Sequence, residues 1–136
     1  MYIDYSIYAV DGVEPEWVLE FKRVRNWLEN ALEYADNAFN IIDVADGLGS
    51  NNMQLWTEDN AAVVTQIVSY PRKKVLHVFL AGGEMDDVMK IEKSVVLWGK
   101  LQQCQAITFV GRPGWSKSLL KDIGYESVHI SMTKEI

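Results

Sequence analysis

Cysteine is almost absent from this sequence, since Cys104 is its one thiol. A lone cysteine cannot form an internal disulfide, so the composition is typical of a protein from a reducing compartment. Cys104 follows two glutamines at the end of a predicted helix, and no neighbouring feature would activate it as a nucleophile. We therefore expect a cytoplasmic protein with a buried, inert thiol.

Long apolar runs are also missing. No stretch approaches the roughly 18 residues that a membrane-spanning helix needs, and the N-terminal segment lacks the basic and apolar regions of a secretory signal. Metal-binding patterns are missing too, because the two histidines and Cys104 are too scattered for zinc and the aspartates lack the spacing of a calcium loop. We expect neither a membrane protein nor a metalloprotein.

Positive charge is in short supply. The 13 Lys and Arg residues face 19 Asp and Glu residues, which leaves a net charge of −6. An acidic surface repels phosphates, so the composition argues against nucleic acid as a partner. The same charge argues, more weakly, against any polyanionic cofactor.

The sequence does contain enough apolar material for one core. It has 136 residues, of which 49% are hydrophobic, and these include five Trp and six Tyr. This length fits a single domain over residues 1–136, which would bury roughly two-thirds of its unfolded surface. No repeat, low-complexity tract or long linker divides the chain.

The first half of the chain has mainly helical patterns. Residues Tyr2–Val10 alternate loosely and predict a first strand. Pro15 then marks the first turn of a helix, whose apolar positions recur at helical spacing as far as Ala35. A shorter helix is predicted over Ala38–Ala45, and the turn formers of Asp46–Asn52 predict a loop.

The second half begins with three β-rich segments joined by short turns. They cover Met53–Trp56, Ala61–Tyr70 and Lys74–Leu80, with Pro71 at a strand end because it cannot donate a ladder hydrogen bond. Consecutive strands with short connections form an antiparallel meander. This part of the sequence therefore predicts a sheet that is mainly antiparallel.

Glycine loops, helices and further strands follow the meander. Ala81-Gly82-Gly83 leads into a predicted helix over Met85–Gln103, with Val88, Ile91, Val95, Trp98 and Leu101 on one face. A strand over Ala106–Val110, a short helix from Trp115 to Asp122 and a last strand over Tyr125–Met132 complete the pattern, with Gly124 ending the helix. Strands joined through helices pair in parallel, so we predict an α/β (α+β) fold with a mixed sheet flanked by helices.

The order strand, glycine loop, helix, strand, short helix, Gly-aromatic and strand resembles the second half of the GNAT acyltransferase fold. The segment Leu119–Tyr125 looks like the helix and Gly-aromatic ending common in that superfamily. Tyr70-Pro71-Arg72, Leu80–Gly83, Gly111–Trp115 and Gly124-Tyr125 look more closely like small GNAT-like proteins of bacteriophages and prophages. The resemblance implies a GNAT-like protein in the host cytoplasm or in a virion.

The same resemblance implies a coenzyme A site at the start of the long helix, where Leu80, Gly82 and Gly83 would hold the pyrophosphate on backbone N–H groups. The sequence departs from the family pattern here. The leading Arg or Gln is absent, and Glu84, Asp86 and Asp87 place carboxylates where phosphates should bind. We predict that these acids cap the helix themselves. A phosphate site with the acids turned away is the alternative.

The catalytic groups are also incomplete. In many family members a Tyr in the short helix protonates the leaving thiolate, and Leu120 stands at that place here. His77 lies in a predicted strand and is the best candidate for a general base, although a structural histidine fits the same pattern.

Basic residues stand out at two places on the acidic background. Arg72 lies at a strand turn, and Arg112 and Trp115 lie around the start of the short helix. These three residues are candidates for contact with an anion or a protein partner, and ordinary solvated charge is the alternative.

Two functions remain open. The first is a non-catalytic structural or interaction protein of the phage or prophage type, with a degenerate coenzyme site and a protein partner or a homo-oligomeric state. The second is an N-acyltransferase that uses acetyl-CoA on an amine substrate.

Overall fold

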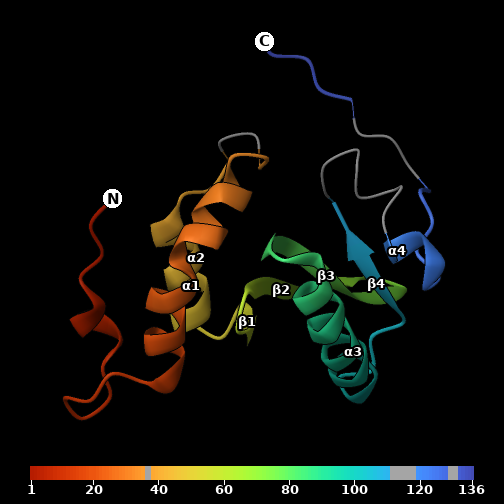
Figure 1. Cartoon of the computed structure of the whole chain (residues 1–136). Helices are drawn as coiled ribbons and strands as arrows, with labels where there is room; N and C mark the ends of the chain where they lie inside the picture. The colour runs from red at the N-terminus through yellow and green to blue at the C-terminus, as the bar shows by residue number, and fades with distance from the viewer. Residues whose placement is uncertain (36–37, 111–118, 129–131) are drawn as a thin grey trace.

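The computed structural model describes residues 1–35, 38–110, 119–128 and 132–136. A four-stranded sheet lies between α1 and α2 on one side and α3 on the other, with α4 near β4 (Figure 1). The elements are η1 (Tyr5–Tyr8), α1 (Glu16–Leu32), α2 (Ile41–Gly49), β1 (Gln54–Glu58), β2 (Ala61–Tyr70), β3 (Lys73–Gly83), α3 (Met85–Leu101), β4 (Ala106–Phe109) and α4 (Leu119–Asp122).

The predicted first strand over Tyr2–Val10 is wrong, because Tyr5–Tyr8 form the short 3-10 helix η1 and Val10 makes only an isolated bridge with Val13. The Asp4 carboxylate accepts hydrogen bonds from the backbone N–H of Ser6 at 3.1 Å and from its hydroxyl at 2.6 Å. Such local side-chain bonds compete with the pairing of a strand. The segment therefore folds onto α1 instead of adding to the sheet.

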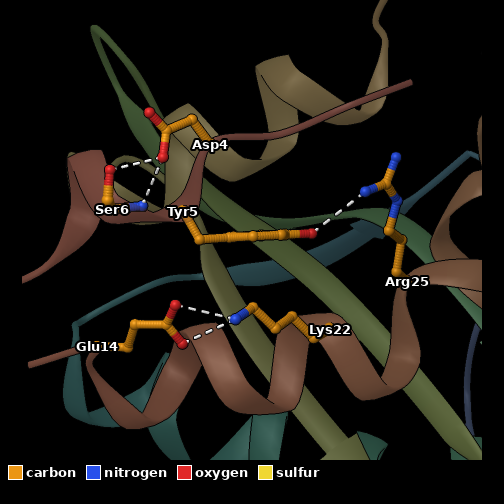
Figure 2. A network of polar contacts seen from close by, with 6 residues as sticks. All are labelled: Asp4, Tyr5, Ser6, Glu14, Lys22 and Arg25. Carbon is orange, nitrogen blue, oxygen red and sulfur yellow. Dashed lines mark hydrogen bonds and ion pairs between the residues drawn. The ribbon is translucent and has the colours of Figure 1, made fainter.

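Polar and aromatic contacts hold η1 on α1. Figure 2 shows the Tyr5 side chain extending toward Arg25, whose Nη1 donates to the phenolic oxygen at 3.3 Å. Lys22 lies over the Tyr5 ring, 4.7 Å from its centre, and donates to both Glu14 oxygens at 2.8 and 2.9 Å. These groups are solvent-accessible, so they set the position of η1 more than they stabilise the fold.

The ends of the two N-terminal helices differ from the predicted ones. Helix α1 begins one residue after Pro15, which is the N-cap, and it ends at Leu32. Helix α2 begins after Asn40, which forms a capping box with Asp43, and continues through the glycines to Gly49. The prediction of a loop over Asp46–Asn52 is therefore wrong for its first four residues. Burial of Leu48 together with the other apolar positions of α2 outweighs the roughly 1 kcal/mol cost of a glycine in a helix.

The sheet has the order β1-β2-β3-β4, and its pairing confirms the predicted mixture. The β1–β2 and β2–β3 pairs are antiparallel, and the β3–β4 pair is parallel. The register between β2 and β3 shifts, so that Val64 faces Leu80 and Thr65 faces Val78. Phe79 is left over as a β-bulge, which bends the strand locally.

The sheet separates two apolar layers. The fully buried Phe21 and Leu28 of α1 pack with Leu80 on one face. On the other face Leu76 and Val78 pack against α3, whose Val88, Ile91 and Val95 are buried as predicted. The predicted fifth member of that face, Leu101, is 78% exposed because the helix ends there.

The C-terminal region matches its prediction in part. Helix α4 ends before Gly124, whose φ of +102° is the left-handed conformation expected after a helix. The predicted start of this helix at Trp115 lies outside the described residues. No strand forms in the described part of Tyr125–Met132. Instead the Tyr125 hydroxyl donates to Glu92 of α3 at 3.1 Å and ties this segment to the helix.

Candidate functional site

The candidate site begins where β3 and β4 part. The parallel ladder between them pairs four residues and ends at Val78 and Phe109, whereas β3 continues to Gly83. Beyond this point the described residues supply no strand on that side of β3. Strand β3 is followed directly by α3, with Glu84 between them. The region in which β3 and β4 diverge, called the parting below, therefore adjoins the start of a helix.

Backbone N–H groups of β3 point into the parting. Glu84 donates its N–H to the Asn60 carbonyl at 2.7 Å, and bonded pairs in an antiparallel ladder recur at every second residue. The N–H groups of Leu80 and Gly82 therefore point toward β2. Those of Ala81 and Gly83 point toward the side that β4 has left.

The two glycines at this junction are required by packing. A Cβ on Gly82 would lie 2.7 Å from the Trp27 carbonyl oxygen of α1. Gly83 has a φ of +103°, and a Cβ there would lie 2.5 Å from the Ala61 Cα. The side chain of Leu80 is buried at 3% exposure. That Leu80, Gly82 and Gly83 bind a cofactor stays a prediction, and these residues could offer only backbone groups.

The prediction that the acids cap α3 is wrong. Glu84 is the N-cap residue, but its side chain makes no capping hydrogen bond. Asp87 is 8% exposed. Its carboxylate accepts the N–H of Asn60 at 2.9 Å, beside the helix start, because the Asn60 carbonyl in turn accepts the N–H of Glu84. The carboxylate also lies 3.4 Å from the Lys90 ammonium. Asp86 is exposed.

The start of α3 therefore keeps free donors. Asp87 and Val88 donate their N–H groups to the Glu84 carbonyl. The N–H groups of Met85 and Asp86 have no protein partner among the described residues. Free N–H groups at the positive end of a helix dipole can bind an anion. The exposed carboxylates of Glu84 and Asp86 oppose this, although salt screens such exposed charges.

His77 lies at the other end of the parting. Its neighbours Leu76 and Val78 face α3, so its side chain faces the side of α1 and α2. The Nδ1 atom lies 2.9 Å from the Thr108 hydroxyl on β4, and no described residue bonds to Nε2. His77 precedes Gly83 by six residues, which is roughly 20 Å along a strand.

Burial lowers the pKa of His77 below its usual value of 6.5. The unfolded chain therefore binds a proton more readily, so His77 stabilises the fold above pH 6.5 and this contribution is lost as the pH falls through the lower folded pKa. We expect a His77→Gln variant to lose less stability than the wild type between pH 7.5 and pH 5. Urea unfolding at both pH values measures this difference, and parallel pH profiles would contradict it.

Known structures share this arrangement of elements. A putative acetyl transferase from Pyrococcus furiosus has a TM-score of 0.63 at 15% identity, with 89% of this chain and 95% of that chain covered. The aminoglycoside N-acetyltransferase AAC(6')-Iy in complex with CoA has a TM-score of 0.67 at 11% identity, with 88% and 90% covered. The tetramutant of the BH1408 protein from Bacillus halodurans has a TM-score of 0.62 at 14% identity, with 88% and 94% covered. The fold is GNAT-like.

The GNAT-like fold was predicted from the sequence, and the likeness confirms it. At these identities the likeness concerns the fold alone. No family model matches the chain, and no curated protein matches it in sequence. The kinship with bacteriophage and prophage proteins stays a prediction.

On the α3 side, the parting of this GNAT-like sheet is almost filled. Phe109, Leu120 and Tyr125 line an apolar pocket of about 20 Å³ against β3 and α3, which is room for one water molecule. Burial raises the pKa of the Tyr125 phenol, and the nearby Glu92 carboxylate raises it further. Leu120 is 6% exposed and has no proton to donate. Among the described residues that line this pocket, Tyr125 has the one phenol, and its hydroxyl already donates a hydrogen bond to Glu92.

The predicted anion or partner residues are not brought together with the glycines. Arg72 is exposed in the β2–β3 turn, at the opposite end of β3 from Gly83 and roughly 35 Å away along the strand. Arg112 and Trp115 lie outside the described residues. No metal-binding group of three His, Cys, Asp or Glu side chains occurs in the part of the chain that the structure describes. Within that part, no helix combines the length and the hydropathy of a membrane span.

The sequence did not reveal two of the pairings that define this site. Thr108 was missed because only the parallel register of β3 and β4 places it beside His77. The position of Asp87 depends on Asn60, which precedes it by 27 residues. Neither pairing leaves a local pattern in the sequence.

Proposed function

We propose that the protein binds an acyl-coenzyme A along β3 and transfers its acyl group to an amine. The supporting observation is one continuous arrangement along β3. Gly83, just before an uncapped helix N-terminus, lies at one end of the parting, and a half-buried imidazole lies at the other, roughly 20 Å away along the strand. An extended ligand with phosphates at one end and a reactive group at the other fits this spacing.

The residues at the junction fit such a ligand in their backbone and less well in their charge. The N–H groups of Met85 and Asp86 would hold phosphate oxygens, and those of Ala81 and Gly83 would accompany the chain of the ligand. Exposed carboxylates beside the helix start would weaken binding at low salt. We therefore expect modest affinity.

The thioester would supply an activated acyl carbon. The acceptor nitrogen bonds to this carbon as the carbon–sulfur bond breaks. His77 Nε2 takes the proton that the nitrogen loses. Since Leu120 cannot donate, the thiolate takes its proton from solvent. Positioning of the reactants supplies most of the remaining acceleration.

A pair of substitutions at the first residue of α3 tests the anion site. Met85→Pro removes one N–H donor, and Glu84 already has the extended conformation (φ −77°, ψ 137°) that precedes a proline. Met85→Ala is the matched control, because it shortens the same side chain and keeps the N–H. By titration calorimetry we expect Met85→Pro to bind acetyl-CoA about 10-fold more weakly than Met85→Ala. Equal affinities would exclude this N–H as a ligand donor.

A second candidate is a non-catalytic protein of the phage or prophage type, which keeps the fold but has a degenerate coenzyme site. The almost filled pocket beside Leu120 and the carboxylates of Glu84 and Asp86 favour it. This candidate requires a protein partner or a homo-oligomer. Wild-type protein that gives neither heat nor a thermal shift with millimolar CoA and acetyl-CoA would overturn acyl transfer and leave this candidate.

A further inference from the structure

We propose that Thr108 is a positioning residue, which fixes the imidazole of His77 in the tautomer that leaves Nε2 free to accept a proton. The inference rests on the proposed function, because it concerns the same base. It adds a residue from the neighbouring strand and a chemical role for that residue.

The register of the sheet sets the contact. His77 and Thr108 are direct neighbours in the parallel ladder, and only the pair Val78 and Phe109 lies between them and the parting of the strands. Thr108 Oγ1 lies 2.9 Å from His77 Nδ1. Threonine is branched at Cβ, so few rotamers are open to it and its hydroxyl stays beside the ring.

A hydroxyl can pair with Nδ1 in either tautomer of the ring, because it can donate a hydrogen bond to an unprotonated nitrogen and accept one from an N–H. If it donates to Nδ1, the ring carries its proton on Nε2 and cannot act as a base there. If it accepts from Nδ1–H, Nε2 keeps its lone pair. Only the second arrangement lets Nε2 take a proton, and Nδ1–H then goes on donating to the same oxygen in the charged ring.

Among the described residues, Thr108 is the one that hydrogen-bonds to the His77 ring. Both side chains are half-buried. No other described residue therefore orients the ring through a hydrogen bond. A valine at position 108 would leave Nδ1–H without an acceptor, which favours the opposite tautomer.

Nitrogen-15 NMR of the histidine ring at pH 8 tests the inference without any ligand. We expect wild-type His77 to carry its proton mainly on Nδ1, Thr108→Val to move it to Nε2, and Thr108→Ser to restore it. A wild-type ring protonated on Nε2 would overturn the proposal. A ring that keeps its Nδ1 proton in Thr108→Val would overturn it as well.

Kinetics with acetyl-CoA and a set of simple amines separate this inference from the function on which it rests. We expect Thr108→Val to lower kcat about 10-fold, to leave KM for acetyl-CoA unchanged, and to be rescued by Thr108→Ser. A loss in KM alone would contradict a role through His77. If the tautomer shifts as expected but the wild type acetylates no amine, the role of Thr108 in orienting the ring holds and the proposed function fails.

Discussion

Replacing Gly83 by alanine is expected to destabilise the protein by more than about 3 kcal/mol. Two penalties combine at this position. The φ of +103° is a conformation that residues with a side chain rarely adopt, and the new Cβ would lie 2.5 Å from the Ala61 Cα. Backbone atoms in a sheet cannot move aside as a flexible side chain can. Thermal or urea unfolding of the purified variant measures the loss.

Gly124 provides a matched control for this experiment. Its φ of +102° is almost the same, but a Cβ there would have no atom of the described residues within 4 Å. Gly124→Ala therefore carries the conformational penalty alone, and we expect it to cost about 1–2 kcal/mol. If the two variants lost equal stability, the close approach of β3 to the β1–β2 turn would have no energetic weight.

Replacing Asp87 by alanine is expected to cost about 2 kcal/mol of stability. The change removes the hydrogen bond from the N–H of Asn60 to a carboxylate whose side chain is 11% exposed. A hydrogen bond to a charged group contributes about 1.5–3 kcal/mol. The ion pair with Lys90 adds little, because the lysine side chain is 66% exposed.

Asp86→Ala is the comparison that isolates this bond. Asp86 occupies the same helical turn and carries the same charge near the helix start, but it is exposed and no described residue donates to its side chain. We expect it to change stability by less than about 0.5 kcal/mol. A loss for Asp86→Ala as large as that for Asp87→Ala would mean that charge near the helix start, and not the bond to Asn60, stabilises the junction.

The fold was predictable where local patterns agree with tertiary pairing. The meander and α3 follow from alternation, turn residues and helical spacing, and the structure keeps them with ends shifted by at most three residues. The prediction of a strand over Tyr2–Val10 was wrong because the hydrogen bonds between Asp4 and Ser6 favour a tight turn over a strand. Helix α2 extends beyond its predicted end because the free energy gained by burying Leu48 outweighs the cost of two glycines in the helix.

The candidate site was less predictable than the fold. His77 could be found from its residue type and strand position. Its partner Thr108 could not, because a cross-strand pair depends on register. The acids at the start of α3 were predicted from spacing to cap their own helix. Instead, the Asp87 carboxylate accepts a hydrogen bond from the N–H of Asn60 in the β1–β2 turn.

The parallel pairing of β4 also bears on the order in which the sheet forms and opens. His77 and Thr108 are 31 residues apart in the chain, whereas a two-residue turn joins β1 to β2. Closing the longer connection costs more chain entropy, and the pairing that offsets this cost involves only four residue pairs. The meander is thus the more cooperative unit, and β4 is the strand whose detachment needs the least free energy. The imidazole therefore lies at the boundary between a persistent part of the sheet and a part that can open on its own.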